Sequence, residues 1–189
     1  MIWPGPTNLH RALSRSAMIV AGLMLAATPS VQSQAARSPA PSPVAALEWL
    51  LGGTWIADGS KMAPGLERIE TRYVWSDNNA FIRFTTHFVT DNATIKNYDG
   101  SFFWNPESSS LAMWYMDARN GITQGPVVAD ANAFVMKFHG PDFEGKPADL
   151  RVTVTRKDPN LYTWVVDEAL PDGAWKPLAS LDYRRTPGE

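Results

Sequence analysis

From residue 54 onward, the chain consists of short runs in which apolar and polar residues alternate. Alternation at every second position is typical of a β-strand with one buried face and one solvated face. Asn, Asp, Gly and Pro residues separate these runs, as they do at the tight turns of antiparallel hairpins. The pattern predicts ten strands. They cover residues 54–58, 66–75, 81–90, 95–104, 110–117, 122–128, 133–140, 148–157, 161–168 and 175–184.

The turns predict which side chains lie on the same face of the sheet. A two-residue turn at 78–79 pairs Trp75 with Ile82 and Tyr73 with Phe84, so the large apolar side chains of both strands share one face. A meander of such hairpins is expected to close, because closure leaves no strand edge unpaired. We therefore predict an all-β fold, a single antiparallel up-and-down barrel of about 8–10 strands. A two-sheet sandwich and an incompletely closed barrel are the alternatives.

The first 36 residues have the pattern of a secretory signal peptide. Arg11 and Arg15 supply its positive start, residues 17–27 form an apolar stretch, and small residues at 31–35 offer a cleavage site. The apolar stretch is shorter than the ~20 residues that a membrane-spanning helix needs. A short membrane anchor is the alternative to a cleaved signal.

Residues 37–43 form a Pro/Ser/Ala linker, which cannot build a core. We expect residues 44–187 to form the barrel domain and to begin with a short helix over 44–51. The chain contains no Cys, so it forms neither disulfides nor thiolate metal sites. Export without disulfides fits a bacterial envelope better than a eukaryotic secretory pathway. The expected location is therefore the periplasm or the outside of a bacterium.

Charge also limits the partners that the protein can have. The chain carries 17 Lys and Arg residues against 19 Asp and Glu residues, and it has no basic cluster. A mildly acidic protein of this kind is not expected to bind nucleic acid or an anionic membrane surface. We expect no stable insertion into a membrane.

A Leu-x-Trp-Leu segment (Leu47 to Leu50) followed by Gly53-x-Trp55 opens the run of strands. This opening resembles that of the lipocalin-like (calycin) β-barrel superfamily, most of all its uncharacterised exported bacterial members. The resemblance implies a barrel that holds a small ligand, and an arginine of the last strand that lies over Trp55. Arg185 is the first choice for that arginine and Arg184 the second. The usual disulfide and the other loop motifs are not evident, and ten strands exceed the usual eight.

If the barrel has a cup, its open end gathers inward-facing residues that could meet a ligand. A mostly apolar pocket with a few polar groups is typical of small-molecule sites. We therefore predict an exported binding barrel that holds an apolar or amphipathic molecule. The candidate ligand-binding residues are Phe88, Tyr98, Tyr115, Asp117, Gln124, Met136, Phe138, Glu168 and Trp175.

Two alternatives remain open. In the first, the barrel is an enzyme in which Asp117 and Glu168 divide the roles of acid and base on a small apolar substrate. In the second, the interior is filled and the protein acts through its outer face. Trp114 and Met116 are expected on that face, covered by the N-terminal helix and in part by a second copy in a homodimer.

Haem and metal ions are not expected. Some calycin-type barrels, the nitrobindin-like group, hold haem through a histidine, and beyond the signal peptide this chain has only His87 and His139. His87 is expected on the outer face opposite Glu70, and His139 at a strand end where Phe138 faces inward. Two histidines on separate faces cannot share one metal ion.

Overall fold

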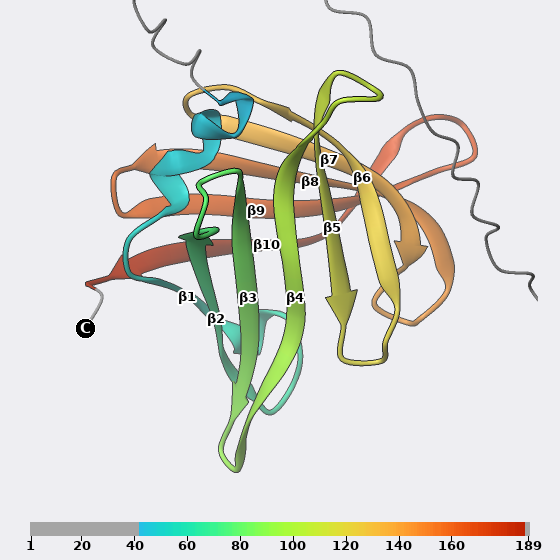
Figure 1. Cartoon of the computed structure of the whole chain (residues 1–189). Helices are drawn as coiled ribbons and strands as arrows, with labels where there is room; N and C mark the ends of the chain where they lie inside the picture. Colours follow the sequence, from blue (N-terminus) through green and yellow to red (C-terminus); the bar gives the residue numbers. More distant parts are fainter. Residues whose placement is uncertain (1–41, 188–189) are drawn as a thin grey trace, which may run out of the picture. The chain divides into compact units, whose positions relative to one another are not determined.

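The computed structural model describes residues 42–187 and shows a closed barrel of ten antiparallel strands (Figure 1). Neighbours in sequence are neighbours in the sheet, and β1 pairs with both β2 and β10. This confirms the predicted all-β, up-and-down barrel and rules out the sandwich and the open barrel. The strands are β1 (Thr54–Asp58), β2 (Leu66–Trp75), β3 (Phe81–Thr90), β4 (Ala93–Asn105), β5 (Ser110–Asp117), β6 (Ile122–Ala129), β7 (Ala133–Pro141), β8 (Pro147–Asp158), β9 (Leu161–Ala169) and β10 (Trp175–Thr186).

A short helical segment precedes the first strand, as predicted, and it is a 3₁₀ helix, η1 (Pro43–Leu50). The Ser42 hydroxyl caps it by accepting a hydrogen bond from the Val44 N–H at 3.3 Å. Val44, Leu47 and Leu50 are fully buried in the core. The helix lies across one end of the barrel (Figure 1). We refer to this end as the closed end.

The helix does not cover the outer face around Trp114 and Met116, contrary to our expectation. These side chains are 38% and 40% exposed. The physical reason is that η1 gains more by burying its apolar residues in the barrel core than by lying on a half-polar sheet surface.

The predicted register of β2 and β3 is confirmed, with Trp75 opposite Ile82 and Tyr73 opposite Phe84. Asn79 has a φ of 54°, a conformation that Asn tolerates in a tight turn. The register shifts at several places elsewhere, one of them between Pro177 and Ala179 in β10. A shift by one residue moves the side chains beyond it to the opposite face.

The predicted signal peptide, residues 1–36, and nearly all of the predicted linker, residues 37–43, lie outside the described residues. Within residues 42–187, no helix has the length and apolar character needed to cross a membrane.

The closed end is held together by contacts between the two ends of the barrel domain. The Trp55 Nε1–H donates to the Leu50 carbonyl at 2.7 Å. The Arg185 guanidinium lies 4.4 Å from the centroid of the Trp55 ring and donates a hydrogen bond to the Trp49 carbonyl. The alternative, Arg184, is exposed. One end of the barrel is therefore filled by aromatic rings and tied to η1.

Candidate functional site

A cavity of about 630 Å³ occupies the barrel interior. Small-molecule sites in proteins fall in the range of roughly 300–1,000 Å³. Its lining includes residues of the loops at the end opposite η1: Met62 to Gly65 after η2 (Gly59–Lys61), Ala118 and Arg119, and Asp142 and Phe143. We call this end the mouth. The interior is therefore not filled by side chains.

Aromatic rings form much of the cavity wall. Tyr98 contacts both Phe88 and Tyr115 edge to face, with ring centroids 5.9 and 5.1 Å apart, and Tyr115 contacts Phe138 in the same way at 6.1 Å. Edge-to-face contacts of this kind hold the rings in defined orientations. Aliphatic side chains complete the wall, among them Met136, Leu150, Val152, Val154 and Val166.

In the part of the chain that the structure describes, charged lining residues occur only toward the mouth, where Asp117, Arg119 and Asp142 lie. The Asp117 carboxylate already has two partners: its Oδ1 accepts from the N–H groups of Arg119 and Gly121, each at 2.8 Å. A side chain at Gly121 would press against this carboxylate, since an added Cβ would lie 2.9 Å from Asp117 Oδ2. Asp117 therefore caps the β5–β6 turn while it lines the cavity.

Two tyrosines lie just below the mouth. Burial raises the pKa of Tyr115 to about 12, although a hydrogen bond with Thr123 partly opposes this shift. Burial also raises the pKa of Tyr98, and a hydrogen bond with Asn97 partly opposes this shift. Both phenols remain neutral near pH 7 and present O–H groups to the cavity.

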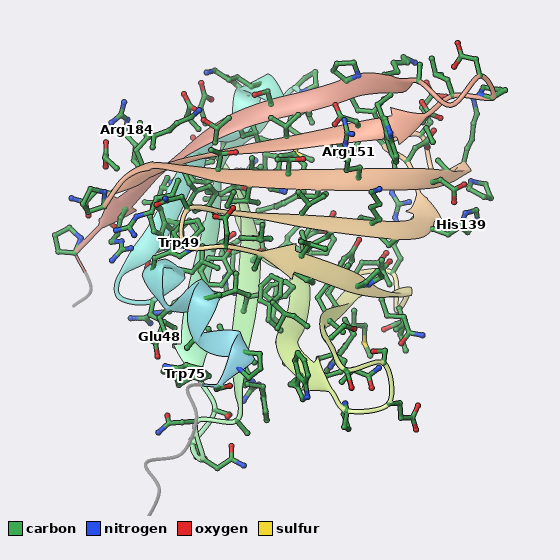
Figure 2. All side chains as sticks on the ribbon, turned by 90° about the horizontal axis from the view of Figure 1, so that it is seen from above. Glu48, Trp49, Trp75, His139, Arg151 and Arg184 are labelled. Carbon is green, nitrogen blue, oxygen red and sulfur yellow. The ribbon has the colours of Figure 1, made fainter. Side chains whose placement is uncertain are left out.

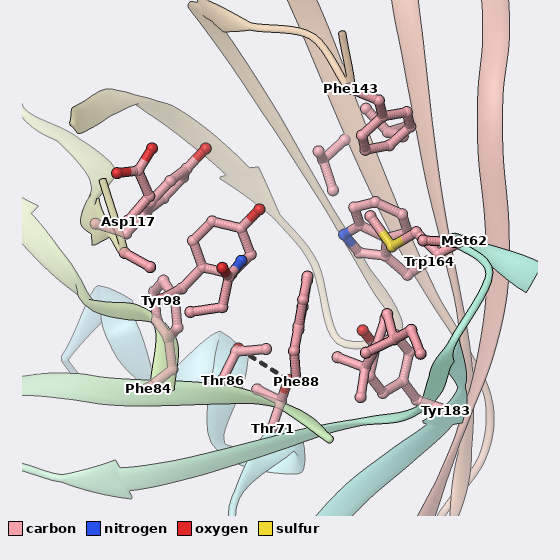
Figure 3. A pocket seen from close by; sticks show the side chains of 18 of the residues that line it. Met62, Thr71, Phe84, Thr86, Phe88, Tyr98, Asp117, Phe143, Trp164 and Tyr183 are labelled. Atoms are coloured by element: carbon pink, nitrogen blue, oxygen red, sulfur yellow. Dashed lines mark hydrogen bonds between the residues drawn. The ribbon is translucent and has the colours of Figure 1, made fainter. Parts of the chain in front are cut away.

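Five more hydroxyl groups line the deep part of the cavity, which we call the floor: those of Thr71, Thr86, Tyr73, Tyr162 and Tyr183. Thr71 is paired with Trp55 across β1 and β2, which places it at the closed end. Thr71 and Thr86 hydrogen-bond to each other through their Oγ1 atoms at 2.9 Å, as the dashed line in Figure 3 shows.

The floor tyrosines are buried, and their phenols are neutral near pH 7. Desolvation raises the pKa of Tyr73 to about 12, and a hydrogen bond with Tyr162 opposes the shift. Desolvation also raises the pKa values of Tyr162 and Tyr183, and the neighbouring tyrosines add to the effect. The Tyr162 and Tyr183 rings stack with centroids 4.8 Å apart. The floor is thus a rigid set of neutral hydroxyls next to Trp55.

Most of the candidate ligand-binding residues line this cavity. They are Phe88, Tyr98, Tyr115, Asp117, Met136 and Phe138. Three others, Gln124, Glu168 and Trp175, are not among the lining residues.

Gln124 lies on the outer face, paired with Trp114, and is exposed. The β5–β6 connection explains this correction. It is a three-residue loop, 118–120, closed by a hydrogen bond from the Asp117 N–H to the Gly121 carbonyl. With this loop length Thr123 takes the inward position, where it is buried.

Glu168 and Trp175 lie near the mouth. Glu168 keeps the inward register given by its pairing with Leu150 but does not line the cavity, whereas Trp175 has turned to the outer face. Glu168 is paired with Leu150 in the sheet, and its Oε2 lies 3.8 Å from the Lys176 ammonium. The register shift between Pro177 and Ala179 turns Trp175 outward, where its ring packs 4.4 Å from the Arg151 guanidinium. Of the two carboxylates considered as an acid–base pair, only that of Asp117 lines the cavity.

Sequence analysis missed the floor hydroxyls as functional candidates. The signal was present, because the predicted register places Thr71 opposite Thr86 on the same face as Tyr73 and Phe84. Two threonines among large apolar side chains on an inward face are a sign of a buried polar site. Trp164 also lines the cavity and was not among the predicted site residues.

The two histidines do not line the cavity. His87 is paired with Glu70 in the sheet. His139 is exposed, with Nδ1 2.9 Å from Asp149 Oδ1, and lies at the far end of the strands from Trp49 (Figure 2). Within residues 42–187, no group of three or more His, Asp or Glu side chains is arranged to hold a metal ion.

Comparison of the chain with models of protein families found no match. Comparison with curated proteins also found none.

Proposed function

We propose that this protein is a small-molecule binding barrel that holds one apolar or amphipathic molecule in its interior. The observation that carries the proposal is the cavity of about 630 Å³, closed at one end by η1 and walled by aromatic and aliphatic side chains. An apolar molecule gains about 25 cal/mol for each Å² of surface that it removes from water. A cavity of this size and lining therefore favours apolar occupants.

The polar groups at the mouth support an amphipathic occupant as well. Arg119, Asp117 and Tyr98 line the cavity at the end where a ligand would meet solvent. A charged or polar head group can stay hydrated there while the apolar body is buried.

We further propose that the protein works outside the cytoplasm of a bacterium. This part rests on the signal-like pattern of residues 1–36 and on the absence of Cys from the sequence.

The test of binding is a fluorescence titration with N-phenylnaphthylamine, an uncharged probe that brightens in apolar surroundings. Val152 faces the cavity, so Val152→Trp is expected to fill part of it and to weaken probe binding at least tenfold. Thr153→Trp adds the same ring to the adjacent residue, which is not among the lining residues, and is expected to leave binding unchanged. Equal binding by both variants, or none by the unchanged protein, would contradict the proposal.

Native mass spectrometry identifies a natural occupant directly. The full chain is expressed, purified without denaturation and measured before and after unfolding. A stoichiometric extra mass that disappears on unfolding is the expected result, and it gives the mass of the ligand.

A further inference from the structure

The floor hydroxyls lie deep in the barrel, where polar groups are costly unless they are hydrogen-bonded. Thr71 and Thr86 are only 4% and 6% exposed. Tyr73, Tyr162 and Tyr183 are also buried, and all five residues line the cavity. These hydroxyls therefore surround the deepest position that a ligand can reach.

The hydroxyls have more hydrogen-bonding capacity than they use among themselves. Each has one O–H to donate and two lone pairs. One bond joins Thr71 to Thr86, one long contact of 3.5 Å joins Tyr73 to Tyr162, and Thr71 also interacts with Tyr183. Each such bond uses one hydrogen, so the cluster keeps O–H groups that can be donated to a ligand. In Figure 3 the Thr71–Thr86 pair and Tyr183 lie on the side of the cavity away from Asp117.

No positive charge lies among the floor residues. Among residues 42–187, the one cationic side chain in the cavity lining is that of Arg119, in the loop that follows Asp117 at the mouth. An ionised carboxylate at the floor would lose its hydration without gaining a counter-ion, and this is strongly unfavourable. An uncharged oxygen pays far less and can accept hydrogen bonds from the hydroxyls.

We propose that the molecule held in the cavity carries an uncharged oxygen, a ketone or an alcohol, at the end that lies deepest in the barrel. That oxygen accepts hydrogen bonds from Thr86 and Tyr183: Thr71 donates to Thr86, and the Tyr183 hydroxyl turns from Thr71 to the ligand. Any charged group of the ligand points to the mouth beside Arg119. This inference rests on the proposed binding function and specifies its ligand class and orientation.

Three ligands of nearly the same shape test the inference: methyl β-naphthyl ketone, β-isopropylnaphthalene and β-naphthoate. Each displaces N-phenylnaphthylamine in a competition titration. The ketone is expected to bind about fivefold to tenfold more tightly than the hydrocarbon, which is the range for one or two net hydrogen bonds. Naphthoate is expected to bind with its carboxylate at the mouth, so Arg119→Gln weakens it and leaves the ketone unaffected.

Two variants remove floor hydroxyls and one serves as a control. Thr86→Val and Tyr183→Phe are each expected to lower the preference for the ketone over the hydrocarbon about fivefold. Thr85→Val makes the same change at the neighbouring residue, which is not among the lining residues, and is expected to keep the preference within twofold. If Thr86→Val does not fold, Tyr183→Phe still tests whether the floor hydroxyls carry the preference for the ketone.

The outcomes separate the inference from the proposed function. The inference is wrong if the ligands bind but the ketone has no advantage, if the floor variants leave that advantage intact, or if they weaken naphthoate as much as the ketone. If neither the probe nor any of the three ligands binds the unchanged protein, the proposed function itself fails.

Discussion

The two ends of the barrel use similar residues for opposite purposes. At the closed end, two side chains hydrogen-bond to the backbone of the helix segment: Trp55 donates to the Leu50 carbonyl, and Arg185 donates to the Trp49 carbonyl while covering the Trp55 ring. In the cavity, the hydroxyls of Tyr115 and Tyr183 face a space large enough for a ligand. Aromatic content alone thus does not distinguish a core from a binding site. What distinguishes them is whether the rings border an open space: Tyr115 and Tyr183 line the cavity, and Trp49 and Trp55 do not.

Removing an aromatic ring from the closed end should destabilise the protein far more than removing one from the outer face. Trp55 is fully buried, so Trp55→Ala is expected to lower the free energy of unfolding by about 3–5 kcal/mol. Trp114→Ala on the outer face should cost less than about 1 kcal/mol, because this ring is already partly in water. Urea denaturation followed by circular dichroism measures both. Equal losses would mean that the closed end is not the stabilising part.

Alkaline pH should unfold the protein through its floor tyrosines. In the folded state the pKa of Tyr73 is raised from 10.0 to about 12, so unfolding releases a proton above pH 10. Their contribution to stability is complete below about pH 10 and is lost as the pH rises towards 12; for Tyr73 it is on the order of 1–3 kcal/mol. Phenolate absorbance and circular dichroism, recorded together against pH, are expected to change in the same transition. Full ionisation of all tyrosines near pH 10 with the fold intact would contradict the buried, neutral floor.

Arg185 and its neighbour Arg184 make a matched pair for testing the contact over Trp55. Arg185→Gln removes the cation–π contact and the hydrogen bond to Trp49, and it should lower the free energy of unfolding by about 1–2 kcal/mol. Arg184→Gln changes an exposed residue and should stay within about 0.5 kcal/mol of the unchanged protein. Thermal unfolding of both variants gives the difference. A smaller effect at position 185 than at 184 would show that the guanidinium is not anchored.

Substitution of a charged residue at the mouth should have the smallest effect on stability. Asp117→Ala removes the acceptor for the N–H groups of Arg119 and Gly121, and a loss of about 1 kcal/mol in stability is expected. Binding of N-phenylnaphthylamine should stay within twofold, because the apolar wall is unchanged. Asp99→Ala, at an outward position opposite Met116, is the control and should affect neither property. A large loss of probe binding in Asp117→Ala alone would mean that this carboxylate contacts the ligand directly.

The strand pattern was predictable because alternation and turn residues are local signals. The register of β2 against β3 follows from one Asn-Asn turn, and the structure matches it. Closure into a barrel follows from a general rule about unpaired edges, so it too could be predicted.

Two predicted site residues lie on the opposite face of the sheet from the one expected. In each case the cause is one extra residue, in a loop or at a shift in register, that the alternation of apolar and polar residues does not reveal. Gln124 turned outward because the loop at 118–120 has three residues, with Asn120 at a φ of 64°. Trp175 turned outward because Pro177, which has no N–H to give to the sheet, lies at a shift in register. Each reverses the facing of the strand residues next to it, and the facing of the other strands is as predicted.

The floor could not be predicted as a unit, because its members come from distant strands. Tyr73 on β2 and Tyr162 on β9 are 89 residues apart, and their contact depends on the curvature of the whole barrel. Alternation shows that both face inward. It does not show that they meet at the same depth.

The contact between Trp49 and Arg185 also has a consequence for how the molecule forms. The two residues are 136 positions apart, and β1 has its second partner only in β10, the last strand. Until that strand is available, β1 and β9 each keep an unpaired edge and the ring cannot close. Contacts this distant in the chain slow folding, since a long loop must be ordered before they form. The barrel therefore stays open, with two exposed strand edges, until β10 has been synthesised.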